Sequence, residues 1–388
     1  MMGSGREMEL IWASEEFVIA GRPYTGFPIL LTDDMESFIP ANEFMRHYLL
    51  RGAIGSERSW PSTGRAMYDY LSFLQAHELD WRDVDRGEAK ALVAAYRDYS
   101  KKECGLAVST IRQRLHYICQ FYLYSLSKGW INRLPFTTEE RKVKRETGFL
   151  AHVDSSGGKV QVNDVMPRSH KSLPKFLSLN QVRVLVEGVK NSHHRMLIRF
   201  ALKTGLRREE LATFPLAYVL DPDKAGRSER NIKIVLDPND GHGIRTKGSK
   251  VRDIYISRDF LSEVVKYAQV FRGERSSLAA KPSKTLFVNQ DGLPFASDGK
   301  GIERIVRTCG SKVGIKVHPH MLRHTYATHT LVVLQRRKSN IEPLVFLQRQ
   351  LGHSSIQTTM IYLHLINEIA DNAILAYDEE LNDSIESI

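Results

Sequence analysis

Apolar residues recur at helical spacing in the first third of the chain. One stripe, behind a candidate N-cap at Ser62 or Thr63, consists of Met67, Leu71 and Leu74. A second stripe with the same spacing, behind a candidate N-cap at Ser109, consists of Ile111, Leu115, Ile118 and Tyr122. Residues 37–136 are therefore predicted to form a small domain of several helices.

The second half of the chain mixes helical patterns with two predicted strands. Ser178 and Gln181 have the spacing of a capping box, which predicts the start of a helix. Residues 232–236 and 251–256 are rich in Ile and Val and predict strands on either side of a turn at 247–250. Helical spacing returns in two further stretches, from about Gly301 and over 319–334. The expected fold class is mainly α with a small antiparallel β-sheet (α+β).

The same pattern suggests where the domains begin and end. Residues 1–36 hold short apolar runs broken by Gly and Pro, which predict an extended N-terminal extension of unclear role. Helical periodicity fails over 137–177, where basic residues, Ser, Gly and Pro indicate an interdomain linker. A second domain is predicted over 178–366. Residues 367–388 contain seven acidic residues and no Lys or Arg, so this tail should face protein or solvent rather than a polyanion.

Composition favours a folded protein with a polyanionic partner. A length of 388 residues and a hydrophobic content of 42% are enough for two or three domains. The 55 Lys and Arg residues outnumber the 45 Asp and Glu residues, and such an excess favours nucleic-acid binding over a plain solvated surface. Three cysteines without metal-ligand spacing, no long apolar run and no signal peptide predict a cytoplasmic protein that does not bind membranes.

Two groups of basic residues are candidates for contact with a DNA backbone. Arg112 and Arg114 lie off the apolar stripe of their predicted helix and could track phosphates, although an ordinary solvated face is an equal alternative. The linker contains a second basic cluster, made of Arg141, Lys142, Lys144 and Arg145.

The second predicted domain carries residue types that suit cleavage of a phosphodiester. Such a reaction needs cations for the phosphate oxygens, a proton for the leaving alkoxide and an aligned nucleophile. Arg207 and Arg323 offer planar guanidinium groups for the oxygens. Lys247 could supply the proton, and the Tyr362 hydroxyl could attack phosphorus. Acidic clusters suited to two metal ions are missing nearby in the sequence, so a reaction without metal or other cofactor is favoured.

Each residue has an alternative interpretation when it is taken alone. Arg207 could belong to an ion-paired helix face, and Lys247 to an ordinary surface turn. Tyr362 could be a half-buried aromatic residue with a hydrogen-bonded hydroxyl. His320 and His324 lie one helical turn apart, but the glutamate of the zincin motif is missing between them, so metal binding ranks below a structural or catalytic role.

The combination of these residues resembles the conserved boxes of the tyrosine recombinase (phage integrase) family. Residues 201–211 resemble the first box, with Arg207 as its catalytic arginine and Glu210 as its acidic residue. Residues 246–252 resemble the β-hairpin that supplies the catalytic lysine, and Lys247 directly precedes its turn glycine. The helical region before these boxes looks like the family's core-binding domain by pattern only.

Two further boxes complete the resemblance. Residues 318–328 are similar to the second box and place His320 and Arg323 in its histidine-x-x-arginine motif. The final box, at 351–362, supplies His353 in the histidine-or-tryptophan position and Tyr362 as the nucleophile. The chain departs from the family in a longer, basic loop at 334–343, which leaves open which subunit's tyrosine acts at each site.

The resemblance implies a site-specific recombinase or integrase, in which 178–366 is the catalytic domain. Such an enzyme cleaves and rejoins double-stranded DNA through a 3′-phosphotyrosine, without metal or ATP, as a homotetramer in the synapse. A monomer in free solution and a companion or accessory recombinase protein are open alternatives. Rival functions are relaxation of DNA by a type IB topoisomerase mechanism and non-catalytic DNA binding on the same scaffold.

Overall fold

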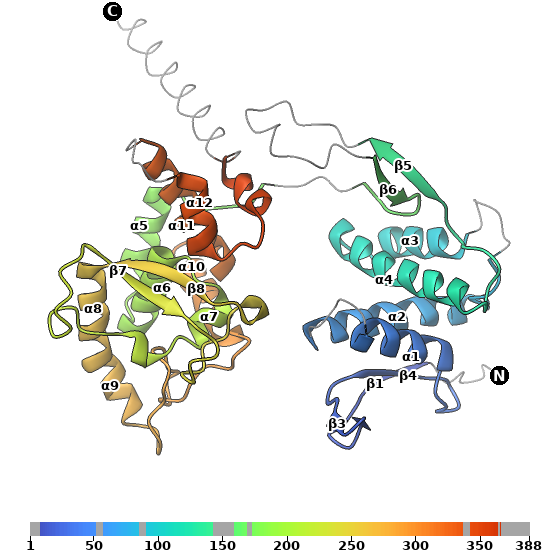
Figure 1. Cartoon of the computed structure of the whole chain (residues 1–388), viewed down its shortest axis with the longest axis horizontal. Helices are drawn as coiled ribbons and strands as arrows, with labels where there is room; N and C mark the ends of the chain where they lie inside the picture. Colours follow the sequence, from blue (N-terminus) through green and yellow to red (C-terminus); the bar gives the residue numbers. More distant parts are fainter. Residues whose placement is uncertain are drawn as a thin grey trace, which may run out of the picture. The chain divides into compact units, whose positions relative to one another are not determined.

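The computed structural model describes residues 8–51, 57–84, 91–142, 159–168, 173–336, 342–363 and 365 of the chain (Figure 1). The chain divides into two compact units, Met1–Lys171 and Ser172–Ile388. Each unit has a hydrophobic core of its own. Lys144, Arg145 and the acidic tail at 367–388 lie outside the described residues, as do positions 337–341 of the predicted long loop.

The first unit combines helices with short antiparallel ribbons. Its helices are α1 (Ile39–Arg46), α2 (Trp60–Ala76), α3 (Leu92–Lys102) and α4 (Val108–Ser127). Its strands are β1 (Glu9–Trp12), β2 (Val18–Ile19), β3 (Arg22–Pro23), β4 (Pro28–Leu31), β5 (Thr138–Lys142) and β6 (Lys159–Asn163). The strands pair as β1 with β4, β2 with β3 and β5 with β6, each antiparallel.

The two predicted apolar stripes form the centre of this unit's core. Met67, Leu71 and Leu74 of α2 and the four predicted residues of α4 are all buried. The hydroxyl groups of Tyr70 and Tyr122, one from each helix, meet at 2.6 Å inside this core. A buried hydroxyl needs such a partner, so the pair fixes how α2 and α4 pack.

The predicted starts of both helices were wrong by a few residues. Helix α2 begins at Trp60, and the hydroxyls of Ser62 and Thr63 bond back to the Ser59 carbonyl at 2.9 and 3.0 Å instead of capping the helix. Helix α4 begins at Val108 behind Ala107, one residue before the predicted cap. Hydroxyl residues in a first helical turn can bond to preceding carbonyls, which makes their exact position ambiguous in a sequence.

The predicted N-terminal extension is folded into this core from residue 8 onward. Strands β1 and β4 lie against α1 and α2 (Figure 1), and Leu30 is fully buried. The buried Asn42 side chain of α1 accepts from Leu30 N at 2.8 Å and donates to Leu30 O at 2.7 Å, as a neighbouring strand would. A Cβ on Gly64 would lie 2.5 Å from Pro28, so glycine is what allows α2 to approach β4 so closely.

The stretch predicted as a linker, 137–177, contains the hairpin-like pair β5 and β6. Thr138 pairs with Asn163 and Lys142 with Lys159 at its two ends. Just after β6, Val165 is buried in the core of the first unit, whereas Leu177 is buried in the core of the second. The described residues at each end of this stretch therefore belong to different units.

The second unit is mostly helical and has one antiparallel strand pair among its described residues. Its helices are α5 (Leu179–Gly188), α6 (Ser192–Thr204), α7 (Arg208–Ala212), α8 (Arg258–Gln269), α9 (Phe271–Ser276), α10 (Lys300–Lys312), α11 (Pro319–Arg336) and α12 (Pro343–Leu351). Strand β7 (Asn231–Leu236) pairs with β8 (Arg252–Ser257), which confirms the two predicted strands. The capping box at Ser178 is also confirmed, since Ser178 and Gln181 bond reciprocally at the start of α5.

Helix α11 is central to this unit and carries several of the predicted site residues. It packs against α6 and α12, and its Thr325 hydroxyl accepts from Leu177 N at 2.9 Å. Helix α12 also contacts β8, where the buried Gln350 amide oxygen accepts from Tyr255 N at 2.9 Å. These contacts bring α6, α11, α12 and β8 together around one group of arginines.

Candidate active site

The first predicted arginine, Arg207, lies at the junction between α6 and α7. Helix α6 ends at Gly205, which has a left-handed φ of 64° and on which a Cβ would lie 2.5 Å from the Tyr326 ring. The chain can therefore turn sharply only with glycine there. Arg207 then precedes α7, and its backbone N–H donates to the Glu210 carboxylate at 2.7 Å.

Carbonyl groups at the C-terminal end of α12 accept hydrogen bonds from three arginines. Arg323 donates to the Leu351 carbonyl at 2.6 Å, Arg207 to the Gly352 carbonyl at 3.0 Å, and Arg252 to the Gln350 carbonyl. The last carbonyls of a helix have no partner within the helix and carry partial negative charge, so cations are stabilised there. Arg323 also donates to the Gly205 carbonyl at 2.6 Å and so joins the ends of α6 and α12.

Glu210 is the buried counter-charge of this cluster, with 1% of its surface exposed. Its carboxylate accepts from Arg207 Nη1 at 3.0 Å and from Arg252 Nη2 at 2.6 Å. Burial alone would raise the pKa of Glu210, but the charges of Arg252, Arg207 and Arg323 outweigh it and hold the pKa below its usual value. One carboxylate among these guanidinium groups leaves an excess of positive charge, which suits an incoming anion.

Arg323 remains a cation although its side chain is almost completely buried. Burial, followed by repulsion from Arg207, lowers its pKa to about 9, and this value is still above neutral pH. A guanidinium presents five N–H donors, so Arg323 retains donors beyond those used by the two carbonyls.

The predicted nucleophile, Tyr362, belongs to the helical residues 356–363 and has 1% of its surface exposed. Its hydroxyl oxygen lies 2.9 Å from Nδ1 of His324 on α11. The ring of His353 is nearly parallel to the Tyr362 ring, at 6.3 Å between centroids, and its own Nδ1 lies 2.9 Å from the Thr359 hydroxyl. Burial raises the pKa of Tyr362 against the opposing charge of Arg323 and Arg207, so the hydroxyl is protonated at neutral pH.

The three site histidines are neutral at neutral pH. Withdrawal from water and the nearby charge of Arg323 lower the pKa of His320 to about 4 and that of His353 to about 3. Withdrawal from water, the neighbouring His320 and Arg323 lower the pKa of His324 to about 3. Neutral imidazoles can each accept one hydrogen bond and donate another.

Lys247 lies in the short helical turn Lys247–Ser249 ahead of β8, and its side chain is exposed. Gly248, the next residue, has a left-handed φ of 70°, which agrees with its predicted role in the turn. The charge of Lys247 is among those that lower the pKa of His320, so the two groups are near enough for their charges to interact. The structure thus brings Arg207, Glu210, Lys247, His320, Arg323, His353 and Tyr362 together within one unit.

Two members of the site were missed as functional candidates in the sequence. His324 was weighed together with His320 as a metal ligand or as a structural or catalytic histidine, but it was given no role of its own, although its position beside Arg323 and one turn from His320 already placed all three on one helix face. Arg252 had no signal in the sequence, because its partners Glu210 and Gln350 lie 42 and 98 residues away.

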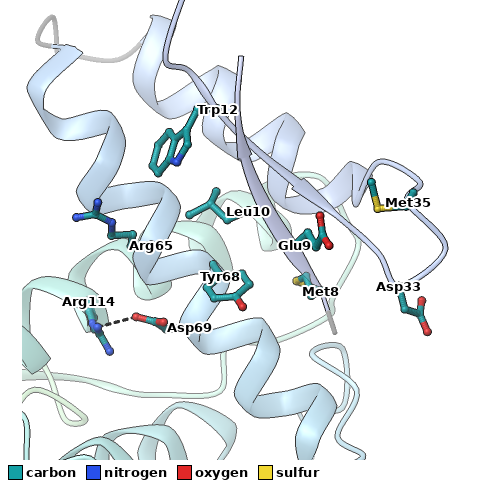
Figure 2. A pocket seen from close by; sticks show the side chains of 10 residues that line it. All are labelled: Met8, Glu9, Leu10, Trp12, Asp33, Met35, Arg65, Tyr68, Asp69 and Arg114. Atoms are coloured by element: carbon teal, nitrogen blue, oxygen red, sulfur yellow. Dashed lines mark ion pairs between the residues drawn. The ribbon is translucent and has the colours of Figure 1, made fainter. Parts of the chain in front are cut away.

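The predicted DNA-contacting arginines of α4 have partners within the first unit. Arg114 pairs with Asp69 at 2.6 Å beside a cavity of about 950 Å³, which Figure 2 shows between β1 and α2. Arg112 donates to the Pro167 carbonyl. Arg141 and Lys142 lie in β5. These four residues belong to a different unit from the arginine cluster.

The described parts of the chain contain no group of three or more His, Cys, Asp or Glu that could hold a metal ion. None of the helices in these parts is long and apolar enough to span a bilayer.

A largely buried cationic cluster near a tyrosine hydroxyl suits an enzyme that transfers a phosphoryl group through tyrosine. The sequence model described as "Phage integrase family" matches residues 175–368, half of the chain, and covers every residue of the site. The chain belongs to the phage integrase family and is a tyrosine recombinase, an enzyme that breaks and rejoins DNA strands.

Individual relatives agree with this assignment. The chain is 27% identical to tyrosine recombinase XerC of Bacillus subtilis (strain 168) over 297 residues, which cover 73% of this chain and 81% of that protein. It is 27% identical to tyrosine recombinase XerA of Pyrococcus horikoshii over 283 residues, 70% of this chain and 88% of the relative.

Solved structures share the fold. The integrase of transposon Tn1549, in complex with transposon right end DNA, matches with a TM-score of 0.55 at 18% identity, over 83% of this chain and 94% of that one. The XerH site-specific recombinase bound to its difH substrate matches with a TM-score of 0.52 at 18% identity, over 85% of this chain and 82% of that one. The predicted fold class, mainly α with a small antiparallel sheet, is confirmed.

Proposed function

We propose that this chain recombines specific sites in double-stranded DNA through a 3′-phosphotyrosine at Tyr362, without metal or ATP. The observation that carries the proposal is the largely buried cluster of Arg207, Arg252 and Arg323 around Glu210, of which Arg323 and Arg207 act by their charge on the Tyr362 hydroxyl. The cluster has more positive than negative charge, and a DNA phosphate would supply the missing anion.

Arg207 and Arg323 bind the non-bridging oxygens of the scissile phosphate in this mechanism. Both are held by helix-end carbonyls, so their orientation is fixed before DNA arrives. Each charge-assisted hydrogen bond to the phosphate would contribute about 1.5 to 3 kcal/mol. Glu210 and Arg252 do not need to touch the DNA, because they hold Arg207 in place and balance its charge.

Lys247 protonates the 5′ oxygen as it leaves, and the exposed position of its side chain allows it to reach a bound backbone. The family resemblance gives His320 a part in proton transfer and His353 a hydrogen bond to the phosphate. General acid and base residues of this kind contribute about 10²- to 10⁴-fold to a rate.

The phosphotyrosine conserves the energy of the broken DNA bond. The 5′ hydroxyl of a partner strand can therefore attack it and reseal the DNA without ATP. In this proposal four protomers pair two sites, and each protomer cleaves one strand. Arg112, Arg114 and the basic residues of 141–145 follow the DNA backbone, with Arg114 exchanging its Asp69 partner for a phosphate.

The experiment that tests the function can be done before the target sequence has been identified. Nicked fragments of the DNA that flanks the coding sequence are incubated with the protein in EDTA, and covalent complexes are isolated and sequenced. We expect an adduct at a defined sequence with the wild-type protein and with Tyr255→Phe, which removes an exposed tyrosine hydroxyl of β8, but not with Tyr362→Phe.

Two outcomes would contradict the proposal. An adduct that persists in Tyr362→Phe would exclude this residue as the nucleophile. Relaxation by a monomer of a supercoiled plasmid that lacks the trapped sequence would indicate topoisomerase activity instead of site-specific recombination.

A further inference from the structure

Helix α11 carries a third residue, His324, beside the two residues of the family motif, His320 and Arg323. His320, Arg323 and His324 follow each other at helical spacing and share one face. Nδ1 of His324 lies 2.9 Å from the Tyr362 hydroxyl oxygen, and no other hydrogen bond to this oxygen is found among the residues that the structure describes. The exposed ring of His320 lies against His324, at 4.4 Å between centroids.

The protonation states allow Tyr362 to be the donor of this hydrogen bond. Burial raises the pKa of Tyr362, and burial, the neighbouring His320 and Arg323 lower that of His324 to about 3. A neutral tyrosine and a neutral histidine therefore meet, and in our proposal the tyrosine O–H donates to Nδ1. The remaining proton of the imidazole is then on Nε2.

We propose that His324 is a catalytic residue, whose Nδ1 holds the Tyr362 hydroxyl for attack and takes up its proton as the bond to phosphorus forms. This inference rests on the proposed function. In the step, the Tyr362 O–H bond breaks and its proton moves to Nδ1, while the tyrosine oxygen bonds to phosphorus. The bond from phosphorus to the 5′ oxygen breaks, and that oxygen receives a proton from Lys247.

The neighbouring groups favour His324 over His353 and the arginines as the acceptor of this proton. His353 Nδ1 is engaged by the Thr359 hydroxyl, and its ring is parallel to that of Tyr362 rather than directed at the hydroxyl. The arginines have no lone pair to accept a proton. The negative charge of a bound phosphate would favour the imidazolium form of His324, and Arg323 and Arg207 would stabilise the developing charge on the tyrosine oxygen.

The first test uses the free protein and so does not depend on DNA cleavage. In ¹⁵N-histidine NMR spectra of the full chain at neutral pH, the signal that His324→Asn removes should show Nδ1 without a proton and Nε2 with one. Tyr362→Phe should shift the Nδ1 signal. The opposite tautomer, or an Nδ1 signal that does not respond to Tyr362→Phe, would overturn the inference.

The second test compares single-turnover cleavage of a nicked duplex that carries the sequence trapped by the wild-type protein. His324→Leu should slow cleavage by about 10²- to 10⁴-fold. His324→Asn places an acceptor where Nδ1 was and should recover part of the rate, whereas His324→Gln places it where Nε2 was and should not. A merely structural role would not separate Asn from Gln in this way.

A sulfur atom in place of the bridging 5′ oxygen distinguishes the two proton transfers, because sulfur leaves without protonation. This substrate should restore cleavage by Lys247→Ala but not by His324→Leu. Wild-type cleavage rates in His324→Leu, or restoration of its rate by sulfur, would overturn the role of His324 alone. Failure of the wild-type protein to form any adduct would instead overturn the proposed function.

Discussion

Arg252 and Glu210 form an ion pair at 2.6 Å in which the two side chains are 7% and 1% exposed. Arg252 Nε has no hydrogen-bond partner among the described residues although it is buried, so the guanidinium is held by its two terminal nitrogens. The pair joins β8 to α7, and Glu210 in turn orients Arg207. A contact in which the nucleophile takes no part thus helps to orient a phosphate-binding arginine.

Arg252→Gln should destabilise the second unit strongly. Removal of one partner from a buried ion pair costs about 3 to 5 kcal/mol, because the other charge remains buried. Urea unfolding followed by far-ultraviolet circular dichroism measures this loss. All four tryptophans, at 12, 60, 81 and 130, belong to the first unit, so tryptophan fluorescence provides an internal reference that should not change. Arg227→Ala, which breaks a far more exposed pair with Glu229, is the control, and an equal loss there would contradict the interpretation.

Lys247→Ala should slow single-turnover DNA cleavage by about 10²- to 10⁴-fold, because the 5′ oxygen would leave without its proton donor. DNA binding, measured by gel shift, should change little. Lys250→Ala removes an equal charge three residues away and is the matched control. Greater loss in the Lys250 variant than in the Lys247 variant would mean that Lys250, and not Lys247, is the proton donor.

The stability of the second unit should fall as the pH is lowered below about 6.5. Withdrawal from water and the charges of Arg323, Arg207 and Arg252 lower the pKa of His353 to about 3, whereas an unfolded histidine has a pKa of about 6.5. The unfolded state therefore takes up a proton first, so this contribution is fully present above pH 6.5 and is lost as the pH falls towards 3. His353→Asn should reduce the slope of unfolding free energy against pH between 6.5 and 4, and an unchanged slope would contradict the burial of a neutral imidazole.

Gly352→Ala should destabilise the protein more than a glycine replacement in open space. Gly352 ends α12 with a φ of 64°, and a Cβ there would lie 2.5 Å from Arg252 Cδ. Gly243 has a φ of 88°, and a Cβ there would have no atom within 4 Å. Alanine at 243 would therefore strain the backbone, as alanine at 352 would, but it would cause no steric clash. Thermal unfolding should therefore show an additional loss of about 1 to 3 kcal/mol for Gly352→Ala over Gly243→Ala. Equal losses would mean that Arg252 moves aside freely.

Local patterns predicted the elements of the second unit well, because a strand or helix periodicity depends on neighbours in the sequence. The capping box at Ser178 and both strands of the sheet are examples. The N-terminal residues were harder to predict. The Asn42 side chain bonds to the backbone of Leu30 on the edge of β4, and no local sequence pattern predicts such a contact.

The candidate site was predictable to the extent that its residues fall in short boxes. Arg207, Arg323 and Tyr362 were selected for chemistry that needs their side chains, and the fold brings these residues into one unit. The contacts of Arg252 and His324 arise from packing of β8 and α11 against segments far away in the chain. Their roles depend on distances between elements, and sequence spacing does not contain those distances.

Peptide mass spectrometry of the trapped complex tests most directly whether Tyr362 becomes covalently linked to DNA. After digestion of the DNA and the protein, we expect one modified peptide, with a nucleotide 3′-phosphate attached to the Tyr362 oxygen. A nucleotide attached to any other residue, or linked through its 5′ phosphate, would contradict the proposed chemistry.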